Sequence, residues 1–262
     1  IPAALNLGLA AARGDIIVRA DAHSRYPAEY LDVLAFTLDE TGADMVGVRE
    51  EADSADGSVM GRAIALVLRS PFATGSPYRF RRKSGPVDAV SFGCWRRELF
   101  AHIGTFDERL IRNQDNELSA RILHGGGRVH MTAALTLRYY ARSTLRTLCR
   151  QAAQTGTWNA FTQRLHPYTF RLRHFLPGLF FVGVLASALA VLATGSLVPA
   201  ALLLPYVLAN AAASIALGAA HHARRFAPLL VPLFATILAC FHLAYGFGIT
   251  RGWLLVASGR WR

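Results

Sequence analysis

The segment VRADAHSRYP, residues 18–27, places an aspartate and a histidine two positions apart at the end of a strand-like run. On an extended backbone, residues i and i+2 point to the same side, so the side chains of Asp21 and His23 can reach one cation. A carboxylate with an imidazole suits Mn²⁺ or Mg²⁺, ions that commonly bridge a protein to substrate phosphates. The alternative is structural: Asp21 caps the turn before Pro27, and His23 is merely exposed.

A second candidate is the carboxylate of Asp115, within RNQDNELSARI, residues 112–122. The residue lies at the expected amino end of a helix. One interpretation is a general base that accepts a proton from an attacking hydroxyl. The other is a helix cap that accepts hydrogen bonds from backbone N–H groups. A cap stabilises the ionised carboxylate and lowers its pKa, which weakens a base but keeps it charged.

The segment RQAAQTGTW, residues 150–158, is a third candidate and carries Gln154 and Trp158. It lies on a basic stretch shortly before a long apolar segment. One interpretation is a helix at the membrane interface, in which Trp158 is an anchor among the lipid headgroups. The other is a contact of the same residues with a substrate.

Alternating helix and strand patterns that would position the first two candidates fill residues 1–142. The runs DIIVRA, ADMVGV and VDAVSFG have the composition of strands, and the segments between them have helical spacing. Such alternation favours a largely parallel sheet with helices on both faces. In these sheets ligands bind beyond the carboxyl ends of the strands, which is where Asp21 lies.

A basic, amphipathic interfacial segment at residues 143–174 is followed by long apolar runs. These runs cover about residues 175–193, 197–220 and 226–250. Each is long enough to cross a bilayer, which needs about 20 apolar residues. We therefore expect an α-helical transmembrane region over residues 175–262.

The arginines around these runs predict their orientation. Basic residues precede the first run, HHARR at residues 221–225 separates the second and third, and the linker TGS carries no charge. By the positive-inside rule both basic loops face the cytoplasm, which places residues 1–142 on the cytoplasmic side of a bacterial inner membrane. Three full crossings would leave the arginines of the tail outside, so the last run is either re-entrant or tolerates this violation.

The net charge of +11 belongs to the second part of the chain, because no Asp or Glu follows Glu117. Beside long apolar runs this charge indicates anionic lipid as the partner. No basic stripe with interleaved aromatic residues is present, so we expect no nucleic acid partner. The cysteines have no paired spacing, which favours a reducing compartment for the soluble part.

Three blocks together carry a resemblance to a known family. ALNLGLAAARGDIIVRADAHSRYP, VSFGCWRRELFAHIGTFDERLIRNQDNELSARI and the segment with Gln154 and Trp158 resemble family 2 glycosyltransferases in order and spacing. The chain is most similar to the bacterial succinoglycan-biosynthesis enzymes of that family, in which DAH replaces the usual Asp-x-Asp. The resemblance covers nearly the whole chain from Leu5.

The resemblance implies a GT-A fold, a nucleotide-sugar donor, and a lipid-linked sugar or growing polysaccharide as acceptor in exopolysaccharide biosynthesis. It implies that Asp21, with His23 beside it, holds a divalent metal (Mn²⁺ or Mg²⁺) on the donor diphosphate. It also implies that Asp115 is the base of an inverting displacement. The apolar runs suit such an acceptor, because it would be held at the membrane.

Further residues are assigned by their place in the matching segments. Gly93 and Cys94, in SFGCWRRE, match the segment that lines the acceptor site. Gln114 stands where the family usually has Glu, and Thr157 stands where an Arg usually precedes the tryptophan. Three residues are assigned to donor binding besides Asp21: Asn6, Gln154 and Trp158.

The nucleotide pocket of this family begins with a strand and loop that would precede Ile1. A parallel βαβ unit needs about 30 residues, so we expect the first strands of the sheet to be missing from an amino-terminally truncated member. A second hypothesis, from another class, is a non-catalytic membrane scaffold or a degenerate fragment of such an enzyme.

Overall fold

The computed structural model describes residues 1–75, 81–220 and 227–261, so the basic loop at 221–225 lies outside the described residues. The chain forms two compact units and passes between them more than once. The domain boundaries that we expect at residues 142 and 174 remain a prediction. The first unit comprises Ile1–Ala52, Ser76–Tyr140 and Thr162–Phe170, and the second comprises Asp53–Gly75, Ala141–Phe161 and Arg171–Arg262.

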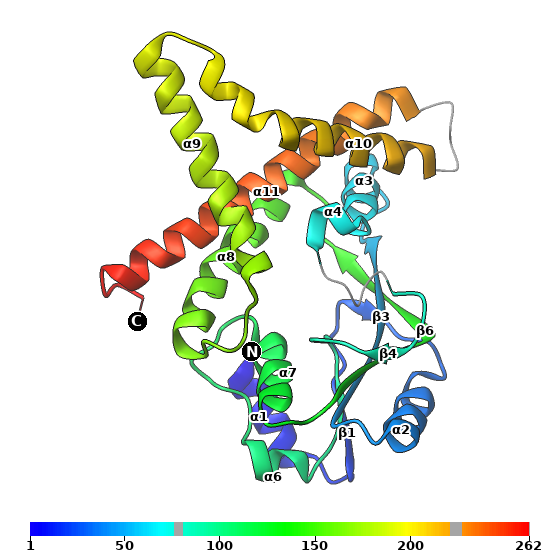
Figure 1. Cartoon of the computed structure of the whole chain (residues 1–262). Coiled ribbons are helices and arrows are strands. Elements are labelled where there is room, and N and C mark those ends of the chain that lie inside the picture. Colours follow the sequence, from blue (N-terminus) through cyan, green and yellow to red (C-terminus); the bar gives the residue numbers. More distant parts are fainter. Residues whose placement is uncertain (76–80, 221–226, 262) are drawn as a thin grey trace. The chain divides into compact units, whose positions relative to one another are not determined.

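The first unit contains both helices and strands (Figure 1). The helices are α1 (Pro2–Ala11), α2 (Tyr30–Thr41), α6 (Leu99–Ile103) and α7 (Gln114–His124). The strands are β1 (Ile16–Val18), β2 (Ser24–Arg25), β3 (Met45–Ser54), β4 (Gly85–Pro86), β5 (Cys94–Arg96) and β6 (Val129–Ala141).

The sheet has the strand order β1-β5-β3-β6-β2, and β4 pairs with β6. The expected α/β class, a GT-A-like sheet with flanking helices, is confirmed. The expected parallel pairing is wrong for every pair whose register is known, because β1 with β5, β3 with β5, β2 with β6 and β4 with β6 are all antiparallel. Strands β1 and β3 do run in the same direction, but β5 lies between them. The run VDAVSFG, which we expected to be a strand, ends just before β5 begins at Cys94.

Apolar residues on the two faces of the sheet form separate cores, since successive residues of a strand point to opposite faces. Met45 and Trp95 pack with Leu118 of α7 on one face. Val46 and Cys94 pack with residues of α2 on the other. Figure 1 shows α2 on one side of the sheet and α1, α6 and α7 on the other. Burial of each large side chain contributes about 1.5–3 kcal/mol, and this layering fixes the strand ends that carry the candidate residues.

The second unit is mainly helical. Its elements are α3 (Val59–Leu68), α4 (Pro71–Thr74), most of α8 (Leu145–Leu165), η1 (Leu172–Phe175), α9 (Leu176–Thr194), η2 (Val198–Leu203), α10 (Leu204–Ala220) and α11 (Ala227–Ala257).

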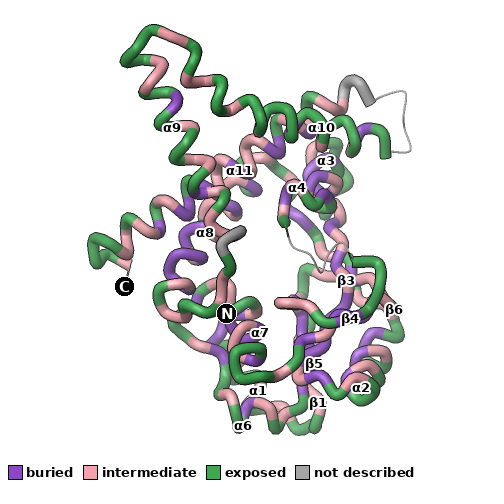
Figure 2. The backbone as a smooth tube through the Cα atoms, viewed as in Figure 1, coloured by how far each residue is buried: buried purple, intermediate pink, exposed green. Residues whose placement is uncertain are grey.

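Three segments among the described residues are long and apolar enough to cross a membrane, which confirms the expected number of runs. They are Leu176–Thr194, Val198–Ala220 and Leu230–Ala257. Figure 2 shows much of α9 as exposed, and the exposed residues include large leucines such as Leu189 and Leu192. An exposed apolar surface of this kind marks contact with lipid or protein.

Small residues bring α8 and α11 close together within the second unit. A Cβ atom added at Gly248 or Gly252 would collide with the backbone of α8. At this contact the Thr157 hydroxyl donates to the carbonyl oxygen of Gly248 at 3.1 Å. Glycines four residues apart allow such close approach of helices in membranes. Position 157 therefore faces α11, where a small side chain fits.

Candidate active site

The loop that follows β1 carries Arg19, Asp21 and His23, and hydrogen bonds hold it at both ends. The N–H of Arg19 donates to the carbonyl oxygen of Gly93 at 3.0 Å, and the N–H of Tyr140 donates to that of His23 at 2.9 Å. Between them, the hydroxyl of Tyr26 accepts from the Asp21 N–H at 2.5 Å and donates to the Asp21 carbonyl oxygen at 3.1 Å. Tyr26 thus closes the turn, and the Asp21 carboxylate is left for other contacts.

The guanidinium of Arg19 joins the two carboxylates that the sequence singles out. Its Nε and Nη2 donate to Oδ1 and Oδ2 of Asp21, each at 2.8 Å, as a bidentate ion pair. Its Nη1 donates to Oδ1 of Asp115. The structure therefore brings Asp21 and Asp115 together at one buried cation.

Burial alone would lower the pKa of Arg19, but the neighbouring Asp115 and Asp21 outweigh it, and the pKa is raised. The Arg19 side chain is 8% exposed, while those of Asp21 and Asp115 are 21% and 19% exposed. The carboxylates are thus accessible to a substrate, and the guanidinium between them stays charged.

Asp115 lies in the first turn of α7, and it does not cap that helix. The N-cap residue is Asn113, which makes no capping hydrogen bond through its side chain. The expected effect of a cap on the pKa of Asp115 is reversed here. Burial raises this pKa to about 6, although Arg19 opposes the shift, and the nearby charges of Asp21 and Glu50 raise it further. Asp115 is therefore ionised at neutral pH and still able to accept a proton.

Phe92 has a backbone conformation that is rare for a residue other than glycine, with φ of 50°. The ring lies 5.8 Å from the guanidinium carbon of Arg19 and 6.2 Å from the imidazole of His23, measured to the ring centroid. Its carbonyl oxygen accepts from the buried hydroxyl of Tyr30 at 3.1 Å. Strained backbone that the surroundings hold in place is concentrated at functional sites, and this strain lies beside the paired carboxylates.

The two residues that match the acceptor segment follow Phe92 directly. A Cβ atom at Gly93 would collide with Trp95 and Met45, so packing requires glycine there. The side chain of Cys94 is fully buried in the core that faces α2, and burial raises its pKa to about 12. Any contact of Cys94 with an acceptor would therefore involve its backbone, and the acceptor role of both residues stays a prediction.

The residues expected to bind the donor lie in different parts of the chain. The side-chain amide of Asn6 donates to Phe106 and Glu108 and accepts from the N–H of Phe106, so it fastens α1 to the loop after α6. Gln154 and Trp158 lie on α8 in the second unit, where Gln154 is exposed. Their donor-binding roles stay predictions.

The carboxylate of Asp21 suits a cation whose other ligands come from a substrate. Among the described residues, no group of three His, Cys, Asp or Glu side chains is placed to hold a metal ion. A hard cation such as Mg²⁺ commonly takes one or two protein carboxylates and completes its shell with phosphate oxygens and water. The Asp21 carboxylate meets that requirement, while the imidazole ring of His23 lies edge-on to the ring of Phe92.

Comparison with known proteins identifies the family of the first part of the chain. Residues 1–104 match the model of glycosyl transferase family 2. The succinoglycan biosynthesis protein ExoA of Rhizobium meliloti (strain 1021) is 31% identical over 178 residues, which are 67% of this chain and 53% of ExoA. Residues 1–104 therefore form a domain of glycosyl transferase family 2. The chain spans about half the length of this curated relative.

Solved structures of TarS from S. aureus are also similar to this chain. TarS residues 1–349 align with 97% of the chain and 70% of TarS, at 14% identity and a TM-score of 0.34. The same portion of TarS in complex with UDP-GlcNAc aligns at 15% identity and a TM-score of 0.36, over 97% of the chain and 71% of TarS.

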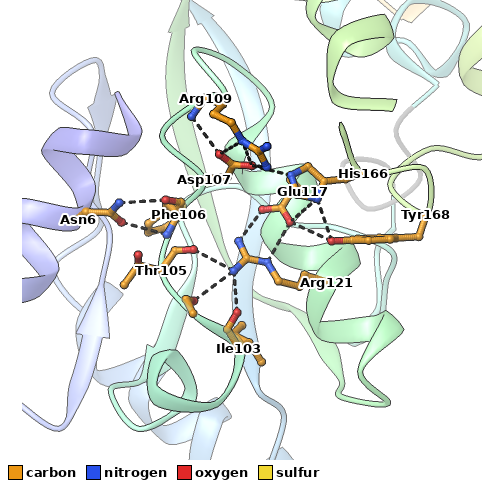
Figure 3. Close-up of polar contacts among 11 residues, drawn as sticks. Asn6, Ile103, Thr105, Phe106, Asp107, Arg109, Glu117, Arg121, His166 and Tyr168 are labelled. Carbon is orange, nitrogen blue, oxygen red and sulfur yellow. Dashed lines mark hydrogen bonds and ion pairs between the residues drawn. The ribbon is translucent and has the colours of Figure 1, made fainter. Parts of the chain in front are cut away.

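A buried ionic cluster that the sequence did not reveal supports the helix carrying Asp115 (Figure 3). Glu117 of α7 is fully buried and accepts from Arg121 Nε at 2.9 Å and Nη2 at 2.6 Å. Arg121 Nη1 donates to the carbonyl oxygens of Ile103 at 2.8 Å and Thr105 at 2.9 Å. One ion pair therefore links α7 to the end of α6.

The same cluster ties residues 162–170 to the first unit (Figure 3). His166 Nε2 lies 2.7 Å from Oδ2 of Asp107, and the hydroxyl of Tyr168 donates to Oε1 of Glu117 at 3.2 Å. Hydrogen bonds from Arg109 are the main reason why the pKa of Asp107 lies well below its usual range. His166 and Tyr168 gave no sequence signal, since their partners lie 59 and 51 positions earlier in the chain.

Proposed function

We propose that this protein is a membrane-bound inverting glycosyltransferase of exopolysaccharide biosynthesis. It moves a sugar from a nucleotide-sugar donor to a lipid-linked or growing polysaccharide acceptor. The convergence of Asp21 and Asp115 on Arg19 is the observation that carries the proposal. The family 2 domain and the similarity to a succinoglycan biosynthesis protein support it.

Each carboxylate then has one task in a single displacement. Asp115, with a pKa of about 6, takes the proton from the acceptor hydroxyl as that hydroxyl attacks the sugar. Asp21, with His23 beside it, would hold Mn²⁺ or Mg²⁺. Such a cation, when bound, offsets the charge on the departing diphosphate. The fixed loop between β1 and β2 keeps Asp21 in place for this role.

The apolar helices fit an acceptor that is held in or at a membrane. Three segments among the described residues are long and apolar enough to span it. The excess of arginine before the first span favours a cytoplasmic position for the first unit, at the inner membrane of a bacterium. In this arrangement Asn6, Gln154 and Trp158 contact the donor, and the backbone at Gly93 and Cys94 borders the acceptor.

The proposal is tested with the full chain in lipid nanodiscs. The protein is incubated with several nucleotide sugars, Mn²⁺ and a bacterial lipid extract, and released nucleoside diphosphate and glycosylated lipid are measured. We expect Asp115→Asn to lower turnover by about 10²–10⁴-fold, the usual contribution of a general base, without lowering the melting temperature.

Asp39→Asn is the matched control, because Asp39 is an exposed aspartate paired with Arg96 on the far face of the sheet. It should leave turnover unchanged. Absence of product from the wild-type protein, or equal turnover by Asp115→Asn, contradicts the proposal and favours a non-catalytic scaffold.

A further inference from the structure

Arg19 uses the same carboxylate oxygens that a divalent cation would need. Both Oδ1 and Oδ2 of Asp21 accept hydrogen bonds from this one guanidinium, each at 2.8 Å. Most of the Arg19 side chain is buried, and the ring of Phe92 lies near it. The guanidinium is therefore held in a fixed place between the two carboxylates.

The charges at this place are unequal. One positive charge, that of Arg19, lies between two negative charges, those of Asp21 and Asp115. The three groups together keep one negative charge, which attracts a further cation. Entry of that cation at Asp21 brings two positive groups onto one carboxylate, and like charges at such short range repel each other.

We propose that Arg19 is a positioning residue that competes with the divalent cation for Asp21. In the donor-free protein Arg19 holds Asp21 and Asp115 together. When the cation with its donor diphosphate arrives, Arg19 gives up oxygens of Asp21 and keeps its contact with Asp115. The inference rests on the proposed function, and it assigns to Arg19 the coupling between donor loading and the base.

A purely structural role for Arg19 predicts the opposite effect on cation binding. Each carboxylate oxygen has two lone pairs, so a brace on Asp21 can leave room for a metal. In that case Arg19 would aim the carboxylate, and its loss would weaken cation binding. The direction in which the cation affinity changes therefore separates competition from bracing.

The test is direct titration of Mn²⁺ into the full chain in detergent, without donor, followed by the electron paramagnetic resonance signal of free Mn²⁺. We expect Arg19→Ala to bind Mn²⁺ about tenfold more tightly, since it removes a charge-assisted bidentate pair. Arg19→Lys keeps the charge but cannot form the bidentate pair, so it should give a smaller increase. Adding Asp21→Asn to Arg19→Ala should abolish the increase in Mn²⁺ affinity.

Arg25→Ala is the control for a general loss of positive charge, because Arg25 is exposed on β2 in the same loop region. It should change the Mn²⁺ affinity by less than about twofold. Melting curves show whether each variant is folded. If Arg19→Ala fails to fold, the Mn²⁺ affinity of Arg19→Lys decides the outcome.

Unchanged or weaker Mn²⁺ binding by the folded Arg19 variants overturns the inference, and so does an absence of Mn²⁺ binding in all of these proteins. Turnover does not enter this measurement. Tighter binding by Arg19→Ala in a protein that transfers no sugar would therefore refute the proposed function and leave the competition standing.

Discussion

Asp115 shows how opposing effects set the properties of one side chain. Removal from water disfavours the charged form and raises the pKa, while the adjacent Arg19 favours it. Burial has the larger effect, and the charges of Asp21 and Glu50 add to it. A helix cap would have lowered the pKa instead. The result is a carboxylate whose pKa of about 6 suits a base that works near neutral pH.

This value predicts the pH dependence of turnover. A base acts only when it is deprotonated, so kcat/KM should be retained above the pKa of Asp115 and lost as the pH falls through about 6. Glu50→Gln removes a negative charge that raises this pKa, so it should move the midpoint to lower pH. The measurement is kcat/KM between about pH 4 and pH 8, a range of about two units on either side of the expected midpoint. A midpoint near 4, the ordinary value for aspartate, would contradict the assignment of this pKa to Asp115.

The sequence allowed part of this site to be predicted. Asp21 and Asp115 stood out by type and position. Arg19 lies two residues before Asp21 on the same extended segment, so the spacing argument that selected His23 applied equally to Arg19. Phe92 gave no such signal, because a positive φ at a residue other than glycine cannot be read from the residue type.

At the level of elements, α7 depends on an ion pair that is nearly free of water. The Glu117 side chain is 0% exposed, and its partner Arg121 also binds backbone carbonyl groups at the end of α6. Loss of one partner of a buried ion pair leaves an uncompensated charge, which is far more damaging than loss of a surface pair. The position of the helix that carries Asp115 therefore depends on Glu117.

We expect Glu117→Gln to lower the free energy of unfolding by about 3 kcal/mol. Replacing both partners, as in Glu117→Leu with Arg121→Leu, should cost less than the single change. Asp39→Asn, which breaks the exposed pair with Arg96, should cost less than about 1 kcal/mol. Chemical denaturation of the full chain in detergent measures all three. Equal losses for Glu117→Gln and Asp39→Asn would show that the buried pair has no special role.

The elements also show why the strand pairing was predicted wrongly. Local patterns indicated helices between the strand-like runs, and the run ADMVGV overlaps the first part of β3. The position of β5 between β1 and β3 depends instead on contacts between distant segments, such as Val18 with Cys94. A three-residue strand such as β5 has too little local pattern to reveal its partner. Helix and strand alternation therefore predicted the layers of the first unit but not the order within its sheet.

At the scale of the whole molecule, the proposed topology can be tested by labelling. The native cysteines are first replaced by alanine, and single cysteines are then introduced by Ser196→Cys, in the linker after α9, or by Asp39→Cys, on α2. In intact cells a membrane-impermeant maleimide should label Ser196→Cys, because the linker faces outwards in the predicted orientation. Asp39→Cys should react only after lysis. Labelling of Asp39→Cys in intact cells would contradict the predicted orientation and indicate the opposite one.

The path of the chain limits how this protein can be taken apart or recombined. Residues 162–170 return to the first unit after α8 has passed through the second. A soluble version that ended at residue 142 would lack His166 and Tyr168, and Asp107 and Glu117 would lose these partners. The membrane anchor is consequently not an interchangeable module, and a functional hybrid would have to inherit the stretch before the first span from the same parent as the sheet.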